Sequence, residues 1–352
     1  MRMTGFRMAL LGLLTCLLAS CAPDGEVAAI KKQASSATPI PSATTNLISG
    51  RVGGNNPVLA VKIDDTEPAR PQIGLREADV VYIEQVEGGV TRLAAIYSSK
   101  LPPKIGPVRS ARISDLELLE QYGKVAFAFS GAQRKLRPVI DQANLFNLGA
   151  ERESAAVYSR EKERRPPWNM ILDPKALFNR AAKRELDIAM PKNMGWNFQK
   201  KVSIGEEVIG AKVRWPGARY EINWSQEFGG WLISQNGESK IDASGAPLVA
   251  STFIAQVVSI TNSEYGDKFG EITPLVATVG QGEAYVFRDG RVIAGSWRRA
   301  DPTSGTLFTT ESGEEIAFKP GQIWFALVAK APDIEYPPVA KPSESASPSP
   351  TK

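Results

Sequence analysis

Carboxylates and arginines are concentrated between Pro57 and Gln121, on segments that otherwise have the apolar pattern of buried β-strands. Two apolar runs end in carboxylates, a third begins at an arginine, and the segment GPVRSAR precedes an expected helix. Charged groups at strand ends and helix starts are a frequent basis of binding sites. We therefore predict that the ligand-binding residues are Asp64, Asp65, Glu84, Arg92, Arg109, Ser110, Arg112 and Asp115.

Arg109 and Arg112 lie immediately before the expected helix. At that position, unpaired backbone N–H groups, the helix dipole and two guanidinium groups favour a bound carboxylate or phosphate. The alternative is that both arginines pair with Glu84, Glu87, Asp115 or Glu117 and stabilise the fold. The sequence supports both interpretations.

Asp64 falls at the carboxyl end of its strand, where open α/β sheets place ligands. Together with Asp65, Glu84 and Glu87, it supplies oxygen atoms for a cation site or for an acid/base pair. No spacing matches an EF-hand or a glycosidase signature, and salt bridges are the simpler interpretation. We therefore expect no metal, no cofactor and no catalytic residue.

Histidine is absent from all 352 residues. Ser-His-Asp and Cys-His mechanisms, zinc sites built on histidine and imidazole acid/base chemistry are thereby excluded. The sequence also contains no P-loop and no dinucleotide-binding motif.

Residues 1–20 have the pattern of a lipoprotein signal peptide. Arg2 and Arg7 precede an apolar run from Met8 to Leu18, which is too short to span a bilayer, and the sequence Leu-Ala-Ser-Cys ends at Cys21. We expect lipidation of Cys21 and a position on the outer face of the bacterial cytoplasmic membrane; the alternative is an ordinary secretory signal. Cleavage leaves 40 basic and 38 acidic residues, so nucleic acid is not an expected partner.

The fold class predicted is α+β, an N-terminal mixed α/β domain followed by a mainly antiparallel β domain. The α/β domain with the charged cleft covers residues 51–200, with a helix over Ser114–Tyr122 that starts in a capping box of Ser114 and Glu117, and a second helix from Asp173. Residues 201–330 contain short, alternating strands. Asn236-Gly237 and Asp289-Gly290 predict tight hairpins there.

Low-complexity segments flank the two domains. Residues 21–50 are rich in Ala, Ser, Thr and Pro, which predicts a flexible tether. Residues 331–352 are rich in Pro and Ser, which predicts a disordered tail.

The segments VKIDDTEPARPQIGLREADVVYIEQVEGGVTRLAAIY and KIGPVRSAR resemble the YerB-like bacterial lipoproteins, whose folded part is a domain of unknown function in two portions. GQGEAYVFRDGRVIAGSWRRADPTSGTLF and KPGQIWFAL resemble the C-terminal portion, and the similarity extends over about residues 55–329. Asp65 stands where that family usually has asparagine. The resemblance implies a surface-anchored lipoprotein with no agreed catalytic activity, associated in some bacteria with the cell-wall synthesis machinery.

The sequence therefore predicts a binding or scaffold module of the cell envelope, attached to the membrane through Cys21. Its expected partner is a cell-wall synthesis protein or an anionic wall precursor, bound in the charged cleft. The alternative function is an enzyme that uses carboxylates or a divalent cation on cell-wall glycan or peptide.

Overall fold

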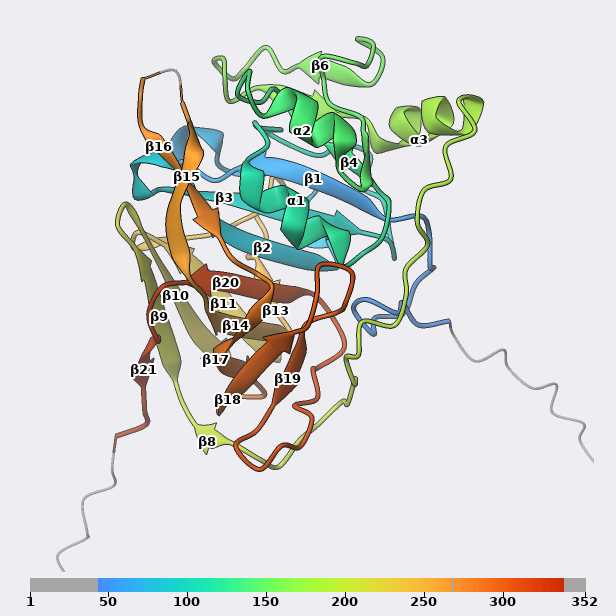
Figure 1. Cartoon of the computed structure of the whole chain (residues 1–352). Coiled ribbons are helices and arrows are strands. Elements are labelled where there is room, and N and C mark those ends of the chain that lie inside the picture. Colours follow the sequence, from blue (N-terminus) through green and yellow to red (C-terminus); the bar gives the residue numbers. More distant parts are fainter. Residues whose placement is uncertain (1–43, 268, 339–352) are drawn as a thin grey trace, which may run out of the picture. The chain divides into compact units, whose positions relative to one another are not determined.

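A computed structural model of the chain describes residues 44–267 and 269–338 (Figure 1). The expected signal peptide, Cys21 and the greater part of the expected tether and tail lie outside these residues. The described chain is α+β, as predicted: its N-terminal part contains a mixed sheet with few helices, and its C-terminal part is mainly antiparallel. None of its helices is long and apolar enough to cross a bilayer.

One large sheet contains strands from both halves of the chain. Its order is β19 (Leu307–Thr309), β18 (Arg291–Arg299), β17 (Gly280–Arg288), β14 (Thr252–Val257), β20 (Ile323–Val328), β2 (Val80–Gln85), β3 (Thr91–Tyr97), β1 (Leu59–Asp64), β4 (Val125–Ala128) and β5 (Leu145–Asn147), with β8 (Glu206–Glu207) paired to β18. The late strand β20 runs parallel to β14 on one side and to the early strand β2 on the other.

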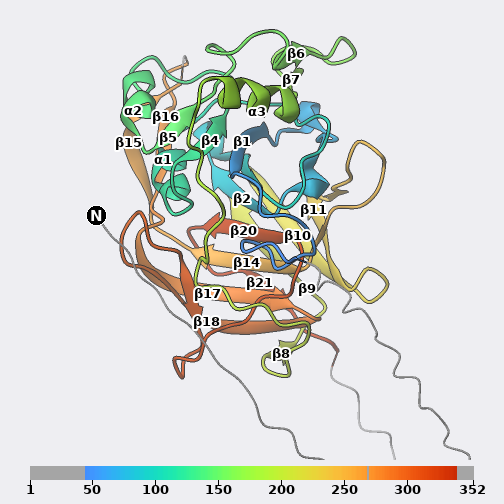
Figure 2. The same ribbon diagram turned by 90° about the vertical axis from the view of Figure 1, so that its right-hand side faces the viewer.

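The sequence of β20, IWFALV, explains its central place. All six residues are buried, and a continuous apolar run is typical of a strand that is covered on both faces. Figure 2 shows β20 between β2 of the N-terminal half and β14 of the C-terminal half. The two halves thus share a sheet, and the domain boundary near residue 200 stays a prediction.

A second, antiparallel sheet has the order β12 (Glu238–Ser239), β11 (Gly230–Gln235), β10 (Ala218–Ser225), β9 (Gly210–Trp215) and β21 (Asp333–Glu335), with β13 (Val249–Ala250) paired to β11. Both predicted tight turns are confirmed. Asn236 and Gly237 between β11 and β12 have φ values of 54° and 88°, and Asp289 and Gly290 between β17 and β18 have φ values of 51° and 72°. Positive φ at both central residues is what a type I′ hairpin requires.

Two small hairpins and three α-helices complete the described chain. The hairpins are β6 (Tyr158–Arg160) with β7 (Met170–Leu172), and β15 (Ile260–Gly266) with β16 (Ile272–Val276). The helices are α1 (Ile113–Glu120), α2 (Arg137–Gln142) and α3 (Pro174–Lys183), and short 3₁₀ turns cover Glu67–Ala69 (η1), Leu75–Glu77 (η2) and Glu87–Gly89 (η3). Helix α1 lies over the sheet beside β15 and β16 (Figure 1).

The helix start predicted at Asp173 is confirmed, because the Asp173 carboxylate accepts the N–H of Ala176 at 2.8 Å. The capping box predicted for Ser114 and Glu117 is wrong. Helix α1 begins one residue earlier, and the Asp115 carboxylate accepts the N–H of Arg112 at 2.6 Å.

Ser114 and Glu117 instead bind the β16 region. The Ser114 hydroxyl accepts the N–H of Val276 at 2.9 Å, and Glu117 accepts the N–H of Thr278 at 2.7 Å. These two side chains therefore form hydrogen bonds with residues far along the chain, and not the helix cap that the local pattern predicted.

The ends of the fold are more ordered than predicted. Within the expected tether, Asn46, Ile48 and Ser49 are buried, and the Ser49 hydroxyl donates to Asp79 at 2.6 Å. Within the expected tail, β21 covers the edge of β9, and Ile334 packs against the core. Each segment contains isolated apolar residues that pack against the folded chain. A composition rich in Pro, Ser and Thr gives no sign of such contacts.

Candidate functional site

The cross-strand register gathers charged residues on one face of the sheet. Arg92 on β3 lies opposite Asp64 on β1 and opposite Glu84 on β2. Directly opposed residues point to the same face, and Lys62, two residues before Asp64, shares that face as well. Helix α1 covers it and contributes Asp115.

Lys62 is the centre of a buried ionic cluster. Its ammonium lies 2.6 Å from Asp115 and 3.0 Å from Glu84, and none of the three side chains is more than 1% exposed. One cation thus faces two carboxylates, and the Glu84 Oε1 atom has no hydrogen-bond partner among the described residues. Burial raises the pKa of Glu84 to about 7; the charge of Asp115 adds to this effect, and Lys62 opposes it.

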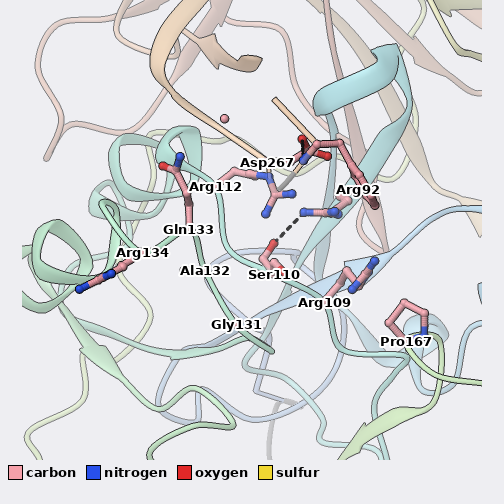
Figure 3. Close-up of a pocket in the computed structure, with 12 residues that line it drawn as sticks. Arg92, Arg109, Ser110, Arg112, Gly131, Ala132, Gln133, Arg134, Pro167 and Asp267 are labelled. Carbon is pink, nitrogen blue, oxygen red and sulfur yellow. Dashed lines mark hydrogen bonds between the residues drawn. The ribbon is translucent and has the colours of Figure 1, made fainter. Parts of the chain in front are cut away.

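A cavity of about 590 Å³ is lined by four arginines, Arg92, Arg109, Arg112 and Arg134 (Figure 3). The remaining walls are Ser110, the loop Gly131–Gln133, Pro167 and the tip of the β15–β16 hairpin. We call this space the arginine cavity. In Figure 3, the Arg92 guanidinium donates to the Ser110 carbonyl, at 3.1 Å, and the Arg134 side chain points away from the other three arginines.

Two of the four arginines have carboxylate partners. Arg109 Nε lies 2.6 Å from Asp64, and Arg112 forms a two-pronged pair with Glu87, at 2.6 and 2.7 Å. Within the part of the chain that the structure describes, Arg92 and Arg134 have no carboxylate within ion-pair distance.

Arg92 therefore lacks an ion-pair partner of its own among the described residues. Burial lowers its pKa, the charges of Arg112 and Arg109 lower it further, and the charges of Asp64 and Glu87 oppose this effect. A guanidinium starts from so high a pKa that it stays charged at neutral pH. The cavity thus has an excess of positive charge.

The loop after β4 adds hydrogen-bond donors to this charge. The Ser130 N–H donates to the Arg109 carbonyl, and the Gly131 carbonyl accepts the N–H of Ala111. These two backbone hydrogen bonds hold the loop against the arginine segment. The N–H groups of Gly131, Ala132 and Gln133 donate to none of the described residues. Gly131 has a φ of 85°, a left-handed conformation that favours glycine. Unpaired N–H groups beside guanidinium groups form the kind of surface that binds carboxylates and phosphates.

Asp65 does not belong to this cavity, because neighbouring residues of an extended chain point in opposite directions. Its carboxylate accepts from Tyr220 at 2.6 Å and from Gln235 at 3.0 Å, accepts also from Thr91, and lies 2.7 Å from Lys240. Asp65 and Lys240 are both buried. This pair links the N-terminal half to the second sheet.

The structure therefore separates the eight predicted site residues into groups. Arg92, Arg109, Ser110 and Arg112 line the arginine cavity, and Asp64 contacts it through Arg109. Glu84, Asp115 and Asp65 do not line it. Sequence reasoning did not assign the loop Gly131–Gln133 or Phe269 to the site; Gly131, three residues after the end of the buried strand β4, was the available signal for the loop. Among the described residues, no group of three or more Asp, Glu or Cys is arranged to hold a metal.

Two family models match the chain: "Protein of unknown function (DUF3048) N-terminal domain" over residues 44–187 and "Protein of unknown function (DUF3048) C-terminal domain" over residues 211–325. The chain belongs to the DUF3048 family. This DUF3048 chain is 24% identical over 298 residues to "Putative lipoprotein YerB" of Bacillus subtilis (strain 168), which covers 80% of this chain and 83% of that protein.

A solved structure of YerB from Bacillus subtilis has the same fold. It aligns with a TM-score of 0.70 at 20% identity, over 82% of this chain and 97% of that one. The predicted resemblance to the YerB-like family is thus confirmed. In this DUF3048 chain the arginines of the cavity belong to the N-terminal family domain, and the hairpin tip belongs to the C-terminal one.

The Asp65–Lys240 pair predicts a large effect on stability. Asp65→Ala leaves the buried Lys240 ammonium without its carboxylate, so we expect the free energy of unfolding to fall by about 3–5 kcal/mol. Urea unfolding of the DUF3048 chain and its variants measures this loss. The control is Arg214→Ala, which breaks the exposed pair with Asp333 and should cost less than about 1 kcal/mol. Equal losses in both variants would contradict the prediction.

Glu84 predicts a specific pH dependence of stability. Its folded pKa of about 7 exceeds the ordinary 4.5, so between these values the native state of this DUF3048 chain keeps a proton that the unfolded chain loses. Stability from this group is full below pH 4.5 and is lost as the pH rises through 7. Glu84→Gln should remove a slope of up to about 1.4 kcal/mol per pH unit in urea unfolding. The exposed Glu314→Gln is the control, and an unchanged slope in Glu84→Gln would refute the assignment.

Proposed function

We propose that this protein is a binding module of the cell envelope that holds an anionic group of a wall precursor, or of a wall-synthesis protein, in the arginine cavity. The observation that carries this proposal is Arg92, a guanidinium with no carboxylate partner among the described residues, placed beside Arg109 and Arg112. A bound anion would relieve the repulsion between the three guanidinium groups.

The loop Gly131–Gln133 supports an anion as the ligand rather than a neutral molecule. The loop lines a cavity that already has a positive excess and its N–H groups donate to none of the described residues, so a ligand with several acceptor oxygens would suit both features. A phosphate has more such oxygens than a carboxylate and more negative charge.

The carboxylates near the cavity favour binding over catalysis. Asp64 and Glu87 are each paired with an arginine, and the Ser110 hydroxyl donates to the Ser130 carbonyl. Glu84 is the observation in favour of an enzyme, since its raised pKa suits a general acid. Its side chain is only 1% exposed, however, and it does not line the cavity.

We propose further that Cys21 anchors this module on the outer face of the cytoplasmic membrane. The pattern Leu-Ala-Ser-Cys at residues 18–21 and the similarity to a protein described as a lipoprotein support this location. A lipid anchor would keep the arginine cavity close to the membrane surface where wall precursors are handled.

The anion site predicts that Arg92 acts in binding and Arg112 in stability. With inorganic phosphate as the probe in isothermal titration calorimetry, Arg92→Gln should lose about 1.5–3 kcal/mol of binding free energy and keep its stability to within about 1 kcal/mol. Arg112→Gln strands the buried Glu87 and should destabilise folding by about 3–5 kcal/mol. Arg152→Gln, which breaks an exposed pair with Asp141, is the control and should change neither quantity. Phosphate binding that is absent from the wild type, or unaffected by Arg92→Gln, would sink the proposal.

The anchor predicts that Cys21→Ser shifts the protein from the detergent phase to the aqueous phase in cell fractionation. Stable attachment requires two acyl signals, and an acylated N-terminal cysteine supplies both. Cys16→Ser is the matched control, because Cys16 lies in the segment that is expected to be cleaved. Unchanged partitioning of Cys21→Ser would show that another feature holds the protein at the membrane.

A further inference from the structure

The tip of the β15–β16 hairpin brings an exposed aromatic ring to the arginine cavity. Phe269 lines the cavity and is 79% exposed, the highest exposure among the large hydrophobic residues of the described chain. Asp267 shapes the turn, because its carboxylate accepts the N–H of Phe269 at 2.8 Å and that of Glu271 at 3.0 Å. The negative charge of Asp267 is thus used within its own turn.

The base of the same hairpin is fixed to the arginine side of the cavity. Thr273 on β16 donates to the Glu87 carboxylate, which also holds Arg112. Ser114 at the start of α1 accepts the N–H of Val276 at 2.9 Å. The aromatic wall and the cationic wall therefore come from different halves of the chain and share the Glu87 carboxylate as a support.

Gln133 contributes a third kind of chemistry. It lines the cavity, and its Oε1 atom is buried and accepts no hydrogen bond from any described residue. A buried acceptor without a donor is costly, so a rotation of the Gln133 amide that lets a ligand hydroxyl or N–H group donate to this atom would increase the affinity. The phosphate group of a monoester, as a dianion, brings no such donor.

We propose that the arginine cavity takes a glycosyl phosphate, with the phosphate against Arg92 and the unpaired N–H groups, and the sugar ring beside Phe269 and Gln133. The inference rests on the proposed function and specifies its ligand class. A sugar has an apolar ring face that an aromatic side chain covers, and it carries hydroxyl donors around its edge. The cavity volume of about 590 Å³ falls in the usual range for small-molecule sites.

The test compares three probes at one ionic strength by isothermal titration calorimetry: inorganic phosphate, α-D-glucose 1-phosphate and phenyl phosphate. We expect the wild type to bind glucose 1-phosphate at least about 10-fold more tightly than inorganic phosphate, because stacking on one aromatic side chain contributes on this scale. Phe269→Ala should remove most of the difference in affinity between glucose 1-phosphate and phosphate and leave phosphate binding unchanged. Gln133→Leu should weaken glucose 1-phosphate and not phenyl phosphate.

Phe228→Ala is the matched control, because Phe228 is 48% exposed in the β10–β11 turn and does not line the cavity. Equal wild-type affinities for glucose 1-phosphate and inorganic phosphate would overturn the glycosyl class and leave the anion site standing. Phenyl phosphate that binds as tightly as glucose 1-phosphate would also overturn it, since the ring would then need no hydroxyl groups. Failure of the wild type to bind any of the three probes would overturn the proposed function together with this inference.

Discussion

Strands β1 and β2 and the residue after β1 carry buried charges, and the surrounding structure must supply partners for them. Lys62, Asp64, Asp65 and Glu84 are all buried, and a charge taken out of water destabilises the fold unless a partner compensates it. Each compensating partner comes from a different segment. Asp115 comes from α1, Arg109 from the stretch before α1, and Lys240 from the loop that follows the β11–β12 hairpin.

This constraint explains why the fold cannot be divided simply at its middle. Asp65 pairs with Lys240, 175 residues later, and hydrogen bonds to Tyr220 of the second sheet. Compensation is nevertheless incomplete on the other face, where Glu84 shares Lys62 with Asp115 and Arg92 has no carboxylate partner among the described residues. Real proteins tolerate such imbalance mainly at functional sites. At the arginine cavity, this unbalanced charge lies next to solvent.

Local pattern predicted short alternating strands over residues 201–330, the two tight turns there and the start of α3, because those features depend on alternation and on turn chemistry within a few residues. The same pattern failed at Ser114 and Glu117, whose side chains bind residues near Val276 and Thr278 that no short window contains. It also grouped Asp64 with Asp65, although adjacent positions of an extended chain point to opposite faces.

The candidate site shows the same limit. Arg92, Arg109 and Arg112 were predicted together because they are near in sequence and flank strand ends. Phe269 could not be assigned to them, since its hairpin is placed by contacts of Thr273 and Ser114 across more than 150 positions of sequence. Which of the arginines lack a carboxylate partner is likewise a property of the packed structure, because it depends on where Glu87 and Asp64 point.

The insertion of β20 between β14 and β2 has a consequence for biogenesis. The Gln322 side chain, just before β20, donates to the carbonyl of Leu75, 247 positions earlier. Pairing over such a distance gives the topology a high contact order and slow assembly. If the chain leaves the cell N-terminus first and unfolded, β2 emerges long before its neighbour. Its hydrophobic edge is then open to strand pairing with other molecules until the last core strand arrives.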